Sequence, residues 1–272
     1  MNSVEILRRS ALATAGLALV WFAVPARASA QIGFAPTAAA PANPKAAEPE
    51  DLTGYWVSIV TEDWRYRMMT PDKGDYPGIF LTPDGQKIAQ SWDPAKDEAA
   101  GEQCKSYGAP AIMRVPTRLH IAWDNDTTLR IETDAGKQVR LFHFNVAETP
   151  KDEAPSWQGY SMASWEGLRP RGFGLPTVAS GGAPRPHDGG YLKVITKNLR
   201  PGYIRKNGVP YGANAMVEEY FDSFQEPNGD TWLVVTSIVT DPQYLAQSYL
   251  TSSQFKKLPD ASGWNPTPCE AK

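Results

Sequence analysis

Two histidines, two carboxylates and a tyrosine are the side chains of this sequence that best fit acid–base chemistry. His120 and His143 lie in predicted strands, and pairing of those strands could bring them near Glu218, Asp241 and Tyr220. Burial in or beside an apolar strand shifts the pKa of a carboxyl group. One such acid and one such base suffice for a lyase, isomerase or hydratase that needs no cofactor. The alternative is structural, with ordinary strand histidines and carboxylates held in salt bridges. Four arginines are the candidate partners in those bridges: Arg65, Arg67, Arg130 and Arg205.

Tryptophan and arginine side chains form a second candidate set, which suits binding better than catalysis. Arginine stacks on aromatic rings and attracts carboxylates, so these residue types fit an aromatic or carboxylated ligand. The alternative is that the aromatic residues belong to the core, where strands usually place them. We predict six ligand-binding residues: Trp64, Arg65, Arg67, Arg130, Trp157 and Arg205.

Other catalytic signatures are absent from the sequence. It has no Gly-x-Ser-x-Gly nucleophile elbow, no phosphate-binding loop and no dinucleotide fingerprint. The third histidine, His187, lies in a glycine-rich stretch far from the other two. Such dispersed histidines do not supply the three or four closely spaced ligands of a zinc site. We therefore predict no metal site and no cofactor.

Cys104 and Cys269 are the only two cysteines. An even number of cysteines in an exported protein favours a disulfide. This bond would close a loop of about 165 residues and stabilise the fold by about 4–5 kcal/mol in the chain-entropy model. The alternative is two free thiols.

The first thirty residues have the three parts of a secretory signal. A basic start with Arg8 and Arg9 precedes an apolar run over residues 11–24, and Ala28 to Ala30 supply the small residues of a cleavage site. The run is shorter than the about 20 apolar residues that span a bilayer, so cleavage is favoured over anchoring. We predict a periplasmic or secreted protein, cut near Ala30, and the arginine pair admits the twin-arginine route.

The charge of the mature chain excludes one class of partner. The chain has 27 Lys and Arg against 30 Asp and Glu, and the signal removes three arginines and one glutamate, which leaves 24 against 29. Nucleic-acid binding rewards clustered positive charge, so we predict no nucleic-acid partner. The mature chain has no second long apolar stretch, and we expect no stable membrane span after cleavage.

Two segments rich in proline interrupt the regular patterns. Residues 31–50 are predicted to be a disordered Ala/Pro-rich leader, with the folded region beginning at Asp51. Residues 145–190 hold many Gly and Pro residues together with several aromatic ones. We interpret this stretch as a long irregular excursion that packs over a surface or a cavity opening.

The rest of the chain is predicted to be mostly β. Thr117–Asp124, Thr128–Asp134 and Gln138–Phe144 are separated by turn residues and should form a meander. Glu218 and Glu219 are adjacent in a predicted strand, so they must point to opposite faces and one could point inward. Helix is expected only over residues 84–92 and 95–101. Six further strands are predicted from their residue types and alternation: Gly54–Val60, Trp64–Met68, Tyr191–Thr196, Tyr203–Lys206, Ala215–Phe224 and Thr231–Val239.

Many short strands with frequent turns and little helix predict an all-β fold over residues 51–272, either a single antiparallel β-barrel or a β-sandwich. The start of the first strand, Gly54-Tyr55-Trp56, resembles the Gly-x-Trp opening of lipocalin-type (calycin) barrels. In that family the tryptophan closes the bottom of the barrel. The arginine expected near the end of such a barrel is missing, with Lys256 and Lys257 nearby. Thr240 to Tyr244 resembles the second lipocalin signature loosely.

The chain also resembles a group of exported bacterial proteins of unknown function. The shared features are the Gly-Tyr-Trp-Val start at Gly54, Cys104-Lys-Ser-Tyr107, Arg205-Lys-Asn-Gly-Val-Pro210 and Thr267-Pro-Cys269. This resemblance implies export and supplies no activity.

Three functions therefore stay open. The first is a lipocalin-like protein that binds a small, partly apolar or aromatic molecule in a barrel cavity. The second is a cofactor-free lyase, isomerase or hydratase in the same cavity, which would need an inward His120 or His143 within reach of Glu218, Asp241 or Tyr220. The third is an envelope interaction module tethered by its Pro-rich leader, which would expose a wide apolar patch.

Overall fold

The computed structural model describes residues 40–167 and 190–272. The predicted signal peptide and residues 168–189, which include His187, lie outside these described residues. No helix within the described ranges is long and apolar enough to cross a membrane.

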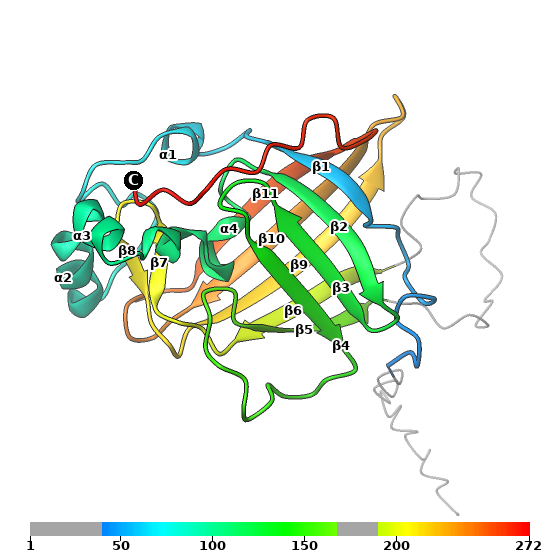
Figure 1. The fold of residues 1–272 in the computed structure, drawn as a ribbon, viewed down its shortest axis with the longest axis horizontal. Helices are drawn as coiled ribbons and strands as arrows, with labels where there is room; N and C mark the ends of the chain where they lie inside the picture. Colours follow the sequence, from blue (N-terminus) through cyan, green and yellow to red (C-terminus); the bar gives the residue numbers. More distant parts are fainter. Residues whose placement is uncertain (1–39, 168–189) are drawn as a thin grey trace, which may run out of the picture. The chain divides into compact units, whose positions relative to one another are not determined.

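Nine strands close into a single barrel, which confirms the predicted all-β fold and favours its barrel alternative over the sandwich (Figure 1). Neighbouring strands follow the order β1-β11-β10-β9-β6-β5-β4-β3-β2, and every pair is antiparallel except β4 and β5. The parallel pair is a departure from the purely antiparallel barrel that we expected. The barrel strands are β1 Gly54–Ile59, β2 Arg118–Asn125, β3 Thr128–Thr133, β4 Val139–Phe144, β5 Tyr160–Glu166, β6 Tyr191–Lys197, β9 Met216–Gln225, β10 Thr231–Thr240 and β11 Tyr249–Leu258.

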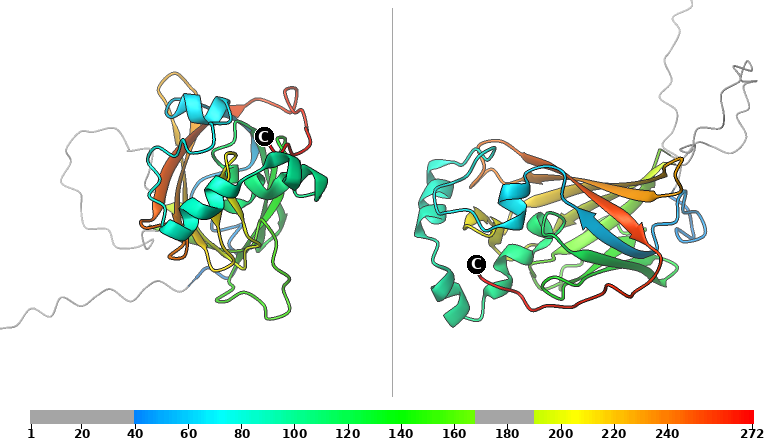
Figure 2. Two further views of the ribbon diagram at one scale, coloured as in Figure 1. Left: turned by 90° about the vertical axis from the view of Figure 1, so that its left-hand side faces the viewer. Right: turned by 90° about the horizontal axis from the view of Figure 1, so that it is seen from above.

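Short helices and a small hairpin lie beyond one end of the barrel, which we call the helix end (Figures 1 and 2). The hairpin pairs β7, Gly202–Arg205, with β8, Val209–Tyr211. The helices are α1 Trp64–Met68, α2 Pro83–Ser91, α3 Pro94–Ala99, the 3-10 helix η1 Gln103–Tyr107 and α4 Ala109–Ile112. The two helices expected from the sequence, over residues 84–92 and 95–101, correspond to α2 and α3.

Large apolar side chains fill the inside of the barrel. Strand residues point alternately to the two faces of a sheet, so every second residue enters the interior. Trp56, Phe142, Phe221 and Phe255 are fully buried, and Trp165 is 7% exposed. Together with aliphatic residues from β2, β3, β6 and β10, they form one continuous core.

One ion pair lies within this interior. Glu219 is fully buried and accepts hydrogen bonds from the guanidinium of Arg140, with Nη1 to Oε1 at 3.0 Å. Arg140 also donates to Oγ1 of Thr196, which shares a hydrogen bond with Ser161. One glutamate of the adjacent pair therefore points inward, and it is Glu219 rather than Glu218.

The disulfide predicted between Cys104 and Cys269 is confirmed. The two Cα atoms are 5.1 Å apart, and the bond joins η1 to the C-terminal segment. The predicted meander over β2, β3 and β4 is also confirmed, with both hairpins antiparallel.

Residues 64–68 form helix α1 and not the predicted strand. Asp63 adopts a left-handed conformation with φ of 49°, and its carbonyl accepts hydrogen bonds from the amides of Tyr66 and Arg67. Alternation of large apolar residues with arginines over five positions is too short to separate a period of 2 from a period of 3.6. The strand prediction for this segment was therefore wrong.

The barrel strands β5 and β11 were not predicted, because their inward positions include small polar residues. In β5, Ser161 and Ala163 point inward beside Trp165, and in β11 the buried Ser253 precedes Phe255. Strand β5 also divides the stretch that we expected to be wholly irregular.

The folded region begins before Asp51, which corrects the expected boundary. The Oε2 atom of Glu50 accepts hydrogen bonds from the amide and hydroxyl of Ser223 at 2.8 and 2.6 Å. The indole of Trp123 donates to Glu48, and that of Trp165 donates to the carbonyl of Pro44. Backbone and carboxylate acceptors in this segment thus satisfy indole and hydroxyl donors of the barrel, which composition alone does not reveal.

Candidate functional site

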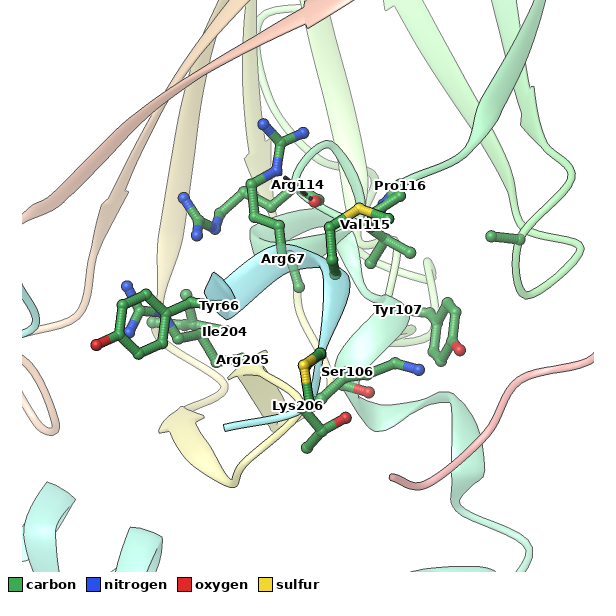
Figure 3. Close-up of a pocket in the computed structure, with 15 residues that line it drawn as sticks. Tyr66, Arg67, Ser106, Tyr107, Arg114, Val115, Pro116, Ile204, Arg205 and Lys206 are labelled. Atoms are coloured by element: carbon green, nitrogen blue, oxygen red, sulfur yellow. Dashed lines mark hydrogen bonds between the residues drawn. The ribbon is translucent and has the colours of Figure 1, made fainter. Parts of the chain in front are cut away.

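A hollow of about 290 Å³ opens at the helix end of the barrel, and we call it the arginine cleft (Figure 3). Its walls come from α1 and the residues after it, from η1, from the segment between α4 and β2, and from β7. Apolar walls are formed by Tyr66, Met68, Met69, Val115 and Ile204. A second hollow of about 360 Å³, bounded by Asp63 and Leu250, shares Tyr66, Arg114 and Arg205 with the first.

Arg67 is held at the inner wall of the cleft by three partners. Its Nε donates to the carbonyl of Arg114 at 3.0 Å and its Nη1 to Oε1 of Glu62 at 3.0 Å. Its Nη2 donates to the hydroxyl of Ser58 in β1 at 3.2 Å. Burial lowers the pKa of this guanidinium, and the charge of Glu62 partly opposes that effect. Arg67 therefore fixes α1 onto the barrel and is itself neutralised by a carboxylate.

Arg114 is the second buried cation of the cleft. Its Nη2 donates to Oδ2 of Asp63 at 3.3 Å, and its guanidinium lies 5.7 Å from the ring centroid of Tyr249. The side chain follows α4 in an otherwise apolar run, Ala111 to Val115, and the residue is 8% exposed. This arginine, like Arg67, has a carboxylate partner.

Arg205 differs from both, because no carboxylate within the described residues pairs with it. Its Nη2 donates to the hydroxyl of Tyr249 at 3.2 Å, and the ring centroids of Tyr66 and Tyr249 lie 5.4 and 5.6 Å from the guanidinium. The residue is 6% exposed, and its Nε and Nη1 atoms are buried without a hydrogen-bond partner. Arg205 thus places an unneutralised positive charge at the wall shared by the two hollows.

The β7–β8 hairpin that carries Arg205 is firmly positioned. The side-chain amide of the fully buried Asn207 donates to the carbonyls of Asp72 and Asp75 at 3.1 and 2.9 Å, which ties the hairpin to the loop after α1. Gly208 has φ of 85°, and a Cβ there would meet Trp92 at 2.2 Å. Only glycine fits this turn, so the turn residues of the sequence set where Arg205 lies.

The structure brings together two of the six predicted ligand-binding residues, Arg67 and Arg205. Trp64 is 65% exposed, and Arg65 points outward with its nearest carboxylate, Asp75, at 4.0 Å. The other two lie away from the cleft. Arg130 pairs with Glu132 on the outside of the barrel, and Trp157 stacks with Arg200.

The five acid–base candidates are not brought together, and four of them lie on the outer face of the barrel. His120 contacts Glu132 at 2.9 Å and stacks on Tyr55, whereas His143 stacks on Tyr160. Desolvation lowers the pKa of His143. Neither histidine is the inward acid or base that the enzyme hypothesis requires.

The remaining three candidates have structural partners. Glu218 pairs with Lys193 at 2.9 Å and accepts a short hydrogen bond from Tyr220; these two bonds lower its pKa. Asp241 is buried and accepts hydrogen bonds from the amides of Gly212 and Gln243 at 2.6 and 2.9 Å. Asp241 therefore organises the loop after β10.

Sequence reasoning missed most of the cleft, including Arg114, Lys206 and the methionines. The available signal was an arginine within an apolar run, because such a residue is rarely buried without a purpose. Lys206 places its ammonium group 4.9 Å from the ring centroid of Tyr107, which also lines the cleft.

Within the part of the chain that the structure covers, no group of three or more His, Cys, Asp or Glu side chains could hold a metal ion. Comparison with protein-family models, with curated proteins and with solved structures finds no match to this chain.

Proposed function

We propose that this chain binds a small, partly apolar or aromatic molecule, and that the binding site is the arginine cleft. The observation that carries the proposal is the composition of the cleft: apolar and aromatic walls around a few buried polar groups. Ligand sites generally combine these two features. The volume of about 290 Å³ suits a ligand of modest size.

The proposal places the ligand at the end of the barrel and not within it. Aromatic side chains that are at most 7% exposed occupy the interior, together with the Arg140–Glu219 pair. A ligand in the interior would have to displace this packing, whereas the cleft is already open.

The resemblance to lipocalin-type barrels supports a binding function. Trp56 is fully buried, its indole donates to the carbonyl of Leu52 at 2.9 Å, and Lys257 lies 5.2 Å from its ring centroid. A cation from the last strand thus covers the tryptophan of the first strand. We also propose that the mature protein works outside the cytoplasm, which the disulfide is compatible with.

Titration with the neutral aromatic dye N-phenyl-1-naphthylamine tests the binding site. We expect saturable binding of one dye molecule, with a rise in its fluorescence. Val115→Trp would fill the cleft and should weaken binding about tenfold or more. Val139→Trp is the matched control, because Val139 is 41% exposed in β4 and does not line the cleft.

Two results would contradict this proposal. One is the absence of saturable dye binding to the unmodified protein. The other is equal weakening by both tryptophan substitutions, since that would place the dye elsewhere on the molecule.

A further inference from the structure

The arginine cleft carries more positive than negative charge. Its cations are the three arginines and Lys206, and the carboxylates bordering the two hollows are Glu62 and Asp63. Glu62 pairs with Arg67 and Asp63 with Arg114. Arg205 and Lys206 contact tyrosine rings and have no carboxylate partner among the described residues. Two positive charges are therefore left for an anion to balance.

Burial makes the charge of Arg205 costly. A guanidinium stays protonated in proteins, so it cannot escape burial by losing its charge. Two of its nitrogen atoms, Nε and Nη1, have lost water without gaining an acceptor. An anion that reached this side chain would supply an acceptor that the fold does not, and it would receive charge-assisted hydrogen bonds.

From these observations we infer that the ligand is an organic acid, with a compact oxyanion that binds at Arg205 and an apolar or aromatic body that packs in the arginine cleft. This inference rests on the proposed function and specifies its ligand class. Guanidinium groups recognise planar oxyanions with two parallel hydrogen bonds, which suits a carboxylate. The body would contact Tyr66, Met68 and Ile204, which line the same hollow.

Isothermal titration calorimetry at pH 7 with 3-phenylpropionate and with its neutral amide tests the inference without any variant. The two probes share one body and differ in the charge of the head group. We expect the acid to bind about tenfold or more tightly than the amide, because it alone neutralises Arg205. We also expect inorganic phosphate, which lacks the apolar body, to bind more weakly than the acid.

Variants then assign the preference to one residue. Arg205→Met should abolish the preference for the acid, and Arg205→Lys, which keeps the charge and loses the planar fork, should reduce it. Arg65→Met is the matched control, because Arg65 is an exposed arginine of α1 outside the cleft lining, and it should keep the full preference. If Arg205→Met does not fold, two results still test the inference. They are the acid-to-amide affinity ratio of the unmodified protein and the reduction of that ratio in Arg205→Lys.

Failure of this inference is distinguishable from failure of the proposed function. Equal affinity for acid and amide, or an acid preference that survives Arg205→Met, would overturn the organic-acid class while the dye still binds in the cleft. Phosphate binding as tight as that of the acid would overturn the role of the apolar body. Absence of dye binding would overturn the proposed function itself.

Discussion

Two buried arginines of this protein have opposite surroundings. Inside the barrel, Arg140 is paired with Glu219, and both side chains are completely buried. In the cleft, Arg205 is 6% exposed and has a tyrosine hydroxyl as its only hydrogen-bond acceptor among the described residues. Glu219 neutralises Arg140 within the fold itself. Arg205 has no such counter-ion among the described residues, and this difference is the basis of the organic-acid ligand proposed above.

The largest expected effect comes from breaking the neutralised pair. Glu219→Gln leaves Arg140 charged and buried, and we expect the free energy of unfolding to fall by about 3–5 kcal/mol. Urea denaturation monitored by tryptophan fluorescence measures the change. Glu218→Gln removes a carboxylate from the outer face next to it and should cost about 1 kcal/mol or less. Equal losses in the free energy of unfolding for the two substitutions would show that the buried pair matters no more for stability than the carboxylate on the outer face.

Loss of the disulfide should have the next largest effect and should act on the cleft region. Replacing Cys104 and Cys269 by serine frees η1, which lines the cleft through Ser106 and Tyr107. We expect a loss of about 2–4 kcal/mol in the free energy of unfolding, below the about 4–5 kcal/mol of the chain-entropy model, because residual structure in the unfolded chain reduces the effect. Hydrogen exchange should increase in η1 more than in β9, which contains Glu219. An equal increase of hydrogen exchange in η1 and β9 would mean that the disulfide stabilises the whole fold and not the cleft region in particular.

Arg205→Met should change the free energy of unfolding much less than Glu219→Gln does. The substitution removes a desolvated charge and loses one hydrogen bond and two ring contacts, so opposing effects nearly cancel. We expect the free energy of unfolding to stay within about 1 kcal/mol of the unmodified value. A loss as large as that of Glu219→Gln would mean that Arg205 is structural after all.

Glu50 provides a third kind of charge, one that is partly buried and can be neutralised by a proton. Burial raises the pKa of this carboxyl group to about 7, although its hydrogen bonds from Ser223 act in the opposite direction. A group with a raised pKa in the folded state stabilises the fold fully below its unfolded value, near 4.5, and the contribution is lost as pH rises through about 7. Stability should therefore decline between these pH values.

Denaturation midpoints at several pH values check this prediction. Glu50→Gln should flatten the decline, because the amide does not titrate. Glu102 is a suitable control, since hydrogen bonding by Lys105 lowers its pKa and Glu102→Gln should leave the decline in place. An unchanged slope in Glu50→Gln would show that another group causes the decline.

The sequence predicted the barrel better than the cleft, for a physical reason. Strands such as β3 place the apolar Leu129 and Ile131 between polar residues, and Asn or Gly residues mark the neighbouring turns, so local rules suffice. Local rules do not identify strands with polar inward residues, such as β5. Its inward Ser161 shares a hydrogen bond with Thr196, a partner 35 positions away that the local sequence does not reveal.

The cleft could not be predicted because it depends on contacts between distant residues. Arg67 and Arg205 were identified by their type, but Arg114 became meaningful only when the fold brought it to Asp63, 51 positions earlier. His120 illustrates the reverse case. Its type suggested catalysis, and the register of β2 and β3 places it opposite Glu132 on the outside of the barrel.

The pairing of the first barrel strand with the last one has a consequence for how the protein folds. β1 forms ladders with β2 and with β11, so Ile59 faces Gln254 across the final seam. The barrel cannot close until β11, which ends at Leu258, has been synthesised. Before that moment both edges of the sheet are open to other strands, and contacts so distant in sequence form slowly. Truncation near the C-terminus should thus yield an aggregation-prone open sheet and not a smaller barrel.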